Sequence, residues 1–534
     1  MKKFLLLLIL STAATAQTSS NLPLVFIDTH GKAIVDEPKI MADLKIIDNG
    51  EGNLNEANDP AAYEGIIGIE FRGSSSQMFP KKPYGFETWD SSGAEIDTTL
   101  FGWPASDDWI FFASYNEKSL IHNVLSMQIA REMGLYASRT KYVELYLNGA
   151  YQGVYVAMEK IKRGKGRVNI AKLNPDEESG DDLTGGYIVK IDKPTGSNQG
   201  SFLSEYSNIT PRFKPTEFFY EYPKDITTTQ KEYIKSYIGD FEKALTQNDF
   251  ANAPDNYRDY INLKSFVLIT ILNEVSRNVD GYRISSYMYK DKDSKGGKLT
   301  LGPPWDYDIS YGNANYCDGN NPQGFSYNFN AICPEDNWFV PFWWQRFLSD
   351  PVFISELRNT YDDLRQNGIL QESKLLELID GYEAELKTAQ ARNFQKWPII
   401  GQYVWPSPLP IANSWAGEVQ EIRDWLSKRL KWLDNNLPRE FSILSTQANE
   451  IAVKVYPNPF VESLSVSLSS DQEDLATFKV YDMTGKSILD FKAAVTEGQN
   501  HINIPLNSTA LVSSVYYMDL SFNNKTEKIK LIKR

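Results

Sequence analysis

The sequence predicts an α+β protein, in which a two-lobed mixed domain is followed by a small all-β sandwich. Three observations predict this class. Short alternating apolar runs joined by turn residues fill the chain from Leu22 to about residue 193, as β-strands do. Segments with helical periodicity dominate from about residue 225 to residue 437. After residue 455 the alternation returns in a series of short runs at regular spacing, which is typical of a sandwich.

Length and charge set the outer bounds. At 534 residues the chain exceeds what one ordinary core supports, so two or three domains are expected. Hydrophobic residues make up 42% and aromatic residues 13%, which indicates a globular protein. Acidic residues outnumber basic ones by 69 to 55, a formal net charge of −14. Because no excess of Lys and Arg is available for phosphate contacts, we expect no nucleic-acid partner.

The amino terminus has the parts of a secretory signal peptide. A positive start at Met1 to Lys3 precedes an apolar run from Phe4 to Leu10, and Ala14-Thr15-Ala16 is a small-residue cleavage signal. We therefore expect a signal peptide at residues 1–16. No later stretch reaches the roughly eighteen apolar residues that a membrane-spanning helix needs, so no transmembrane segment is expected in the mature chain.

The two cysteines, Cys317 and Cys333, suit an oxidising compartment. Two thiols without nearby histidines do not complete a zinc shell, so the pair predicts a disulfide. Closing such a loop contributes about 3 kcal/mol in the chain-entropy model.

A candidate phosphate-binding loop follows an N-terminal β-rich segment, residues 17–65. Ile67, Ile69 and Phe71 alternate as a strand, and Tyr84 and Phe86 begin another. Between them lie a small-residue turn and two lysines: Gly73, Ser74, Ser75, Ser76, Lys81 and Lys82. A strand, a loop with free backbone N–H groups and a strand preceded by lysines are typical of a phosphate site. The alternative is an ordinary polar hairpin.

The middle of the chain alternates helices and hairpins. Residues 117–134 predict a helix, and Asn148-Gly149 joins two alternating strands as a hairpin turn. Residues 225–248 predict an amphipathic helix whose stripe from Tyr233 to Leu245 is more typical of core than of a binding surface. Residues 263–275 are apolar nearly all round and predict a buried helix.

Two acidic stations follow that buried helix on either side of a predicted hairpin. The first is Asn278-Val279-Asp280, and the second is Asp306-Tyr307-Asp308. In kinase-type phosphoryl transfer one Asp accepts the proton of the attacking hydroxyl, and a second Asp, past a short β element, holds the metal on the ATP phosphates. The order of the elements fits a kinase-like two-lobed fold. Taken alone, such acids are more often a turn and a solvated cap.

Several motifs in order make the chain similar to the CotH family, the spore-coat-protein-H-like secreted atypical kinases. The similarity runs from about Ile66 to Gly312 and continues more weakly to about Leu437, so we expect a CotH-like kinase domain at residues 66–440. The motifs are Arg72 to Ser76, Phe79 to Lys82, Lys118 to Ile121 with Asn123, Leu147 to Gly149, Gly153 to Tyr155 with Glu159, Gly185 to Tyr187, Asn278 to Asp280 and Pro304 to Asp308.

The resemblance implies a protein-kinase-like fold and phosphorylation of serine in secreted or coat proteins, with ATP and Mg²⁺ or Mn²⁺. It also implies residue roles. Asp280 is the catalytic acid, and Asp306, with Asp308 as a second candidate, binds the metal. Lys82, or Lys81, binds the α/β-phosphates. Arg72 and the backbone of Ser74, Ser75 and Ser76 face the phosphates, and Glu159 lies by the hinge at the adenine.

Three positions depart from the family pattern. Ser74 stands where Asn is common, Glu117 where Asp is usual and His122 where Arg is usual. The His122 change matters most, because a permanent cation near the phosphates is replaced by a titratable one.

The carboxy-terminal part of the sequence predicts a domain that directs secretion. Residues 441–454 form a polar linker, and residues 455–534 form the sandwich. Its opening Tyr456 to Pro459, the central Val480 to Lys486 and the final Lys528 to Lys533 resemble the type A sorting domain of the type IX secretion system of Bacteroidota. The resemblance implies delivery to the outer-membrane surface or beyond, with the type IX machinery as partner.

The favoured function is transfer of the γ-phosphate of ATP to a hydroxyl, Ser or Thr, of a secreted or surface protein. Two alternatives stay open. One is a catalytically inactive surface or matrix protein that uses the fold as a binding platform. The other is a carbohydrate-associated surface protein, with Trp338, Trp343 and Trp344 as its platform rather than as core.

Overall fold

The computed structural model describes residues 19–534 except 197, 207–214, 440–452, 462, 471, 483–485, 507–510 and 523–524. The chain divides into two compact units, Met1–Glu440 and Phe441–Arg534. The predicted signal peptide and nearly all of the predicted linker lie outside the described residues. The predicted α+β class is confirmed, because a mixed unit precedes an all-β one.

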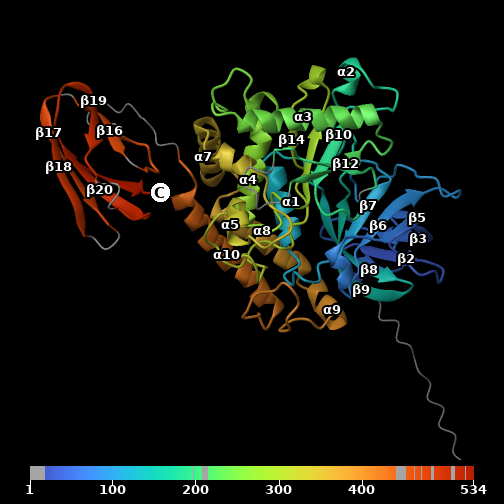
Figure 1. Ribbon diagram of the computed structural model, residues 1–534. Coiled ribbons are helices and arrows are strands. Elements are labelled where there is room, and N and C mark those ends of the chain that lie inside the picture. The colour runs from blue at the N-terminus through green and yellow to red at the C-terminus, as the bar shows by residue number, and fades with distance from the viewer. Residues whose placement is uncertain are drawn as a thin grey trace, which may run out of the picture. The chain divides into compact units, whose positions relative to one another are not determined.

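A closed barrel begins the first unit, shown in blue to teal in Figure 1. Its neighbouring strands are antiparallel except for β2 and β8, which run parallel and close it. Alternating apolar residues of these strands fill the interior. The predicted boundary at residue 65 therefore falls inside a barrel strand, β5. In barrel order the strands are β2 (Leu24–Asp28), β3 (Ile40–Ile47), β5 (Tyr63–Phe71), β6 (Tyr84–Trp89), β7 (Asp108–Phe112), β9 (Ala150–Glu159) and β8 (Thr140–Leu147).

The hairpin predicted at Asn148-Gly149 is confirmed. Leu147 of β8 pairs with Ala150 of β9, and both turn residues have positive φ, 50° for Asn148 and 76° for Gly149. Asn and Gly tolerate this conformation best, so the two residues fix the register of the pair. A further pair, β1 (Ser19–Ser20) and β4 (Asn55–Glu56), lies outside the barrel.

A second, antiparallel sheet has the order β11-β12-β10-β13-β14. Gly185 and Gly186 lead into it where the backbone passes close to its neighbours. A Cβ on Gly185 would lie 1.9 Å from the backbone nitrogen of Lys292, and Gly186 has a φ of +96°. Only glycine meets both demands. The strands are β10 (Tyr187–Ile191), β11 (Ser201–Leu203), β12 (Glu217–Tyr222), β13 (Ser286–Lys290) and β14 (Thr300–Leu301).

Helices make up most of the remainder of the first unit. The buried helix predicted at 263–275 is α4, which packs against α1, α7 and α10. The helix predicted at 117–134 begins later, at His122, because residues 117–121 form a turn instead. The helices are α1 (His122–Glu132), α2 (Gly180–Leu183), α3 (Thr228–Thr246), α4 (Leu263–Ser276), α5 (Phe329–Ile332), α6 (Trp343–Phe347), α7 (Pro351–Gln366), α8 (Glu372–Leu386), α9 (Ala389–Lys396) and α10 (Trp415–Asn436), with single turns η1 (Ser75–Met78), η3 (Tyr257–Asp259), η4 (Asp293–Lys295) and η5 (Ser326–Asn328).

Two of the three tryptophans of the alternative sugar platform lie in the core, whereas the third, Trp338, is half-buried. Trp343 and Trp344 are 0% and 2% exposed. The indole N–H of Trp343 donates to Glu242 at 2.8 Å, and that of Trp344 donates to Thr270 at 3.0 Å. These two rings therefore cannot present a face to a carbohydrate. The α3 stripe is likewise packed against the core.

The predicted disulfide between Cys317 and Cys333 is confirmed, with Cα atoms 5.5 Å apart. It ties the segment after Asp308 to the end of α5.

The second unit consists of two antiparallel sheets, β15-β16-β19 and β18-β17-β20-β21. Alternate residues of these strands form one apolar core. The strands are β15 (Val453–Tyr456), β16 (Leu464–Ser470), β17 (Asp474–Tyr481), β18 (Ser487–Val495), β19 (Gly498–Ile504), β20 (Val515–Phe522) and β21 (Lys525–Ile532).

Candidate active site

Acids from both predicted stations line one cavity of about 810 Å³ in the first unit. Asp280 comes from the loop after α4, and Asp306 and Asp308 come from the segment after β14. Arg72 and the serines of the predicted phosphate loop, Ser74 to Ser76, line the same cavity. Segments more than two hundred residues apart in the chain therefore meet around one space.

Asn278 connects the two acid stations. Its side-chain oxygen accepts from the backbone N–H of Asp280 at 3.1 Å, and its amide donates to the backbone carbonyl of Asp306 at 3.1 Å. Helix α4 ends just before it at Arg277, whose φ of +45° turns the chain sharply. One buried side chain thus sets the spacing of both acids.

Arg283 holds the carboxylate of Asp280. Its guanidinium donates to Asp280 at 2.9 Å and to Asp336 at 3.1 Å, and its side chain is 2% exposed. A buried, two-sided guanidinium of this kind restricts the rotamers of the acid. The side chain of Asp280 itself is 18% exposed and so remains open to the cavity.

Asp306 and Asp308 are fixed by separate donors. The hydroxyl of Ser285 donates to Asp306 at 3.1 Å, and the amide of Asn116 donates to Asp308 at 2.7 Å. Asp306 has a φ of +54°. A non-glycine residue in this region costs about 1–3 kcal/mol and is held only by its surroundings. The strained backbone turns both carboxylates into the cavity from one short segment.

Among the described residues, no Lys or Arg lies within ion-pair distance of Asp306 or Asp308. Burial, followed by the nearby charge of Asp308, raises the pKa of Asp306 to about 7, although the charge of Arg72 opposes the rise. Burial also raises the pKa of Asp308, although the hydrogen bond from Asn116 opposes it. Both residues are half-buried, enclosed by protein yet open to the cavity. A cation placed here would relieve an existing repulsion.

The phosphate loop is short and well supported. Gly73 has a φ of +90°, and a Cβ there would lie 2.0 Å from the hydroxyl oxygen of Ser76, so glycine is required. The guanidinium of Arg72 lies over the ring of Trp305 at 5.3 Å, next to Asp306 in sequence. The predicted phosphate loop and the segment that carries Asp306 and Asp308 are therefore in contact through Arg72 and Trp305.

The two predicted phosphate lysines do not line the cavity. The Lys81 amine is buried and donates to Asn393 at 3.0 Å and to the carbonyl of Val154, and it lies 4.9 Å from the ring centre of Tyr155. Burial lowers its pKa to about 7. The Lys82 amine donates to the carbonyl of Gln77 and so braces the phosphate loop from behind.

Other lysines take positions on the cavity wall. Lys190 of β10 is 6% exposed, and its amine lies 3.0 Å from Glu221 and 3.9 Å from Asp192. Asp192 is a further acid of the cavity, and it accepts from the backbone N–H of Ser285 at 3.3 Å. Sequence reasoning missed both residues; the available signal was a lysine inside an otherwise apolar strand. The lysines of the lining are Lys39, Lys160, Lys190, Lys193 and Lys224.

Glu159 does not reach the cavity. It is fully buried and accepts from the backbone N–H of Arg139 at 2.9 Å and from its guanidinium at 2.7 Å. The next two residues, Lys160 and Ile161, do line the cavity. The backbone after β9 therefore borders the space, while the Glu159 side chain anchors it.

Of the three departures from the family pattern, Ser74 lines the cavity, while Glu117 and His122 lie at the start of α1, close to Asp308. His122 begins α1, and its Nδ1 lies 3.3 Å from the backbone carbonyl of Asp308. Glu117 accepts from the backbone N–H groups of Leu120 at 3.1 Å and His122 at 3.2 Å, so it caps α1. Neither side chain lines the cavity.

The donor set suits a hard divalent cation. Among the described residues no group of three or more His, Cys, Asp and Glu side chains is arranged as a metal site. Mg²⁺, however, usually takes one or two carboxylates and completes its shell with water and substrate phosphates. Asp306 and Asp308 supply two half-buried carboxylates, and burial is the main cause of the raised pKa of each. These residues therefore fit Mg²⁺.

A mixed α+β domain with acids and a serine loop around one cavity defines the class of a kinase-like protein. Residues 69–433 match the family model described as CotH kinase protein. The chain belongs to the CotH kinase family, as its motifs predicted. Residues 454–534 match the model of the secretion system C-terminal sorting domain.

Comparison with individual proteins adds little. No curated protein matches the chain. A solved structure, the crystal structure of a Helicobacter pylori proinflammatory kinase CtkA, is similar at 11% identity over 65% of this chain and 92% of that one, with a TM-score of 0.20.

The sorting domain marks the protein for secretion to the cell surface, as predicted. Within the described part of the chain, no helix combines the length and the apolar character needed to cross a membrane.

Proposed function

We propose that this protein transfers the γ-phosphate of ATP to a hydroxyl group, Ser or Thr, of a secreted or surface protein. The observation that carries the proposal is that Asp280, Asp306, Asp308 and the loop from Arg72 to Ser76 line the same cavity. Membership of the CotH kinase family supports the use of ATP. The cavity, at about 810 Å³, lies in the size range of nucleotide-sized ligands.

Each acid has a role that follows from its surroundings. Asp280 is oriented by Arg283 and Asn278 and open to the cavity, so it orients the acceptor hydroxyl and takes its proton. Asp306 and Asp308, with their unrelieved charge, hold a cation on the phosphate side. When bound, Mg²⁺ neutralises charge on the phosphates. Arg72 and the N–H groups of the serine loop contribute fixed positive potential toward the same group.

The phosphate lysine is reassigned within this proposal. Lys81 and Lys82 do not line the cavity, so Lys190, which pairs with Glu221 on the cavity wall, is the better candidate to contact the phosphates. A lysine held by a glutamate is the arrangement that protein kinases use for this purpose.

The test measures incorporation of phosphate from labelled ATP, with Mg²⁺, into secreted proteins of the cells that produce the protein or into the protein itself. Asp280→Asn should lower the rate by at least about 100-fold, as loss of a general base does. Asp240→Asn, an exposed acid on α3, is the matched control and should leave the rate unchanged. Equal rates in wild type and Asp280→Asn would contradict the proposal.

The second candidate is the inactive platform, which one observation favours: neither predicted phosphate lysine reaches the cavity. Nucleotide binding separates the two functions. A rise in melting temperature with Mg²⁺ and ATP, lost in Asp306→Asn, supports the kinase. A wild type that is folded but insensitive to Mg²⁺ and ATP supports the platform.

A further inference from the structure

A second cavity, of about 710 Å³, lies outside the acid cavity and shares none of its lining residues. Its walls are Asp97, the segment Pro104 to Asp107 and the loop Lys162 to Arg167. We call this loop the basic loop, because four of its six residues are cations: Lys162, Arg163, Lys165 and Arg167. Such a concentration is notable in a chain whose net charge is −14.

The basic loop is folded tightly against the opposite wall. The N–H of Gly164 donates to the carbonyl of Val168 at 2.9 Å, and the N–H of Arg167 donates to the carbonyl of Gly164 at 3.0 Å. A Cβ on Gly166 would lie 2.4 Å from Cβ of Pro104, so glycine allows the two walls to approach. The cations are therefore displayed from a fixed backbone.

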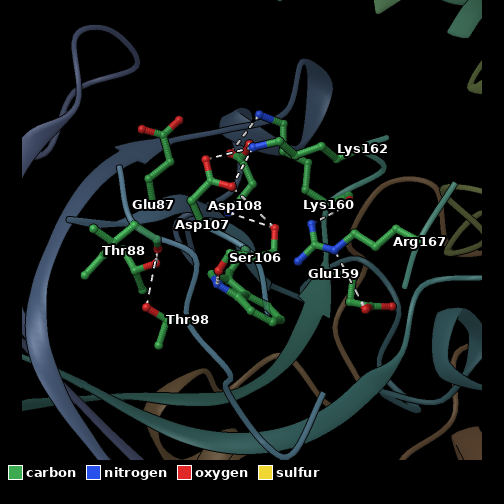
Figure 2. Close-up of polar contacts among 12 residues, drawn as sticks. Glu87, Thr88, Thr98, Ser106, Asp107, Asp108, Glu159, Lys160, Lys162 and Arg167 are labelled. Carbon is green, nitrogen blue, oxygen red and sulfur yellow. Dashed lines mark hydrogen bonds and ion pairs between the residues drawn. The ribbon is translucent and has the colours of Figure 1, made fainter. Parts of the chain in front are cut away.

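One cation of the basic loop is already neutralised. The amine of Lys162 contacts Asp107 at 2.6 Å and Asp108 at 2.9 Å, and Lys160 contacts Asp108 at 3.1 Å (Figure 2). Asp107 and Lys162 of this cluster line the cavity, and their charges balance each other within the protein.

The remaining cations are short of negative charge. Arg167 lies 3.8 Å from Glu159, but Glu159 is engaged at 2.7 Å by Arg139 (Figure 2 shows Arg167 and Glu159). Among the described residues, Arg163 and Lys165 have no carboxylate within ion-pair distance, and the buried Nε of Arg163 has no hydrogen-bond partner. Asp97 is the one acid of the lining outside the Lys162 cluster. Arg163 and Lys165 are thus two cations without an ion pair beside one exposed carboxylate, Asp97.

We infer that this cavity binds the carboxylates of an acidic peptide segment, with Arg163 and Lys165 as its principal contacts. Two flexible cations spaced along a loop match charges spaced along a peptide better than one compact anion, which needs donors that converge on a point. The acidic remainder of the protein repels such a peptide, so electrostatic attraction concentrates it at the basic loop. The inference does not rest on the proposed phosphate transfer.

The experiment measures binding of a labelled oligoglutamate peptide to the full chain without Mg²⁺ or nucleotide. The peptide has no hydroxyl side chains, so it cannot report phosphate transfer. Wild type should bind it in a salt-sensitive manner. The double variant Arg163→Gln with Lys165→Gln should bind about tenfold more weakly, which corresponds to two weak ionic contacts. The control Lys32→Gln with Lys172→Gln removes the same charge from exposed sites and should bind like wild type.

Three results would overturn the inference. Equal binding by both double variants would show that net charge alone acts. Equal binding of an oligoglutamine peptide would show that carboxylates are not recognised. Binding of pyrophosphate without binding of oligoglutamate would show that the source of the anion is a free phosphate. Displacement of the bound oligoglutamate by pyrophosphate would support the inference, because it would show that the peptide occupies an anion-binding site.

Discussion

Two pairs of neighbouring aspartates in this protein have opposite electrostatic states. Asp306 and Asp308 line the acid cavity, and burial raises the pKa of both. Asp107 lines the second cavity, whereas its neighbour Asp108 lines the edge of the acid cavity with Lys160. Burial alone would raise the pKa of each, but Lys162 for both, and Lys160 for Asp108, outweigh it and lower the pKa.

The two pairs therefore differ in whether their negative charge is balanced by cations within the protein. The carboxylates of Asp107 and Asp108 form ion pairs with lysines of the protein itself, so this pair stabilises the fold and requires no bound cation. Asp306 and Asp308 have donors that orient them, namely Ser285 and Asn116, but no described Lys or Arg lies within ion-pair distance of either carboxylate. Titratable residues that line a cavity and have shifted pKa values are candidates for a functional site.

The largest expected effect comes from removing one member of each pair. Asp306→Asn should weaken binding of Mg²⁺ with ATP by at least about 100-fold, because loss of a ligand exceeds the usual loss from its supporting shell. Asp107→Asn should leave that binding unchanged, since Asp107 does not line the acid cavity. Calorimetric titration of the nucleotide measures both. A similar loss in both variants would mean that the pairs do not differ in function.

The next effect tests the satisfied pair. Lys162→Met leaves Asp107 without its cation and Asp108 with Lys160 alone, so it should destabilise the first unit by about 2 kcal/mol. The 28% exposure of the Lys162 side chain keeps this below the cost of breaking a fully buried pair. All 12 tryptophans lie before residue 440, so tryptophan fluorescence during melting reports the first unit.

Lys165→Met is the control for that measurement. Lys165 is exposed and has no carboxylate within ion-pair distance among the described residues. The melting temperature of the Lys165→Met variant should therefore match that of the wild type. If Lys162→Met also melts like wild type, the Asp107–Asp108 cluster is not a stabilising feature.

Local sequence patterns predicted what local patterns determine. The buried α4, the Asn148-Gly149 turn and the acids that follow α4 all depend on neighbours within a few residues, and each was found where expected. The barrel was not predicted, because its closure pairs β2 with β8, more than a hundred residues away.

The lysines show the same limit within the site. Lys81 and Lys82 stand next to the phosphate loop in sequence, but Lys81 turns toward Asn393, a partner 312 positions away that no local pattern could indicate. Asp192 and Lys190 enter the cavity from a strand whose neighbours are set by sheet order. Proximity in sequence therefore predicted the loop and not the cations around it.

A third, smaller effect is the response to pH. The pKa of Asp306 is raised to about 7, so the folded protein binds a proton that the unfolded chain has already lost. Without ligands, stability should therefore fall as pH rises from about 4 and level off above pH 7, by up to about 1 kcal/mol per pH unit. Affinity for Mg²⁺ should change the other way, about tenfold higher at pH 8 than at pH 6, because the metal requires the ionised acid.

Stability and Mg²⁺ affinity are expected to change with pH in opposite directions, so each measurement is a control for the other in the same protein. Asp306→Asn should abolish both, and Asp107→Asn should keep both. Melting curves between pH 5 and 8, with and without Mg²⁺ and ATP, provide the comparison. Parallel pH curves for wild type and Asp306→Asn would assign the titration to another group.

The smallest effect concerns the donor that orients Asp308. Asn116→Ala removes the amide that donates at 2.7 Å to Asp308, so the ionised carboxylate loses a hydrogen bond worth about 1 kcal/mol, or about fivefold in affinity for Mg²⁺ with ATP. Asn315→Ala removes an exposed amide that donates to Tyr403 at 2.9 Å and should leave the affinity unchanged. An unaltered affinity in Asn116→Ala would assign metal binding to Asp306 alone, so the comparison would then be between one unsatisfied acid and the Asp107–Asp108 pair.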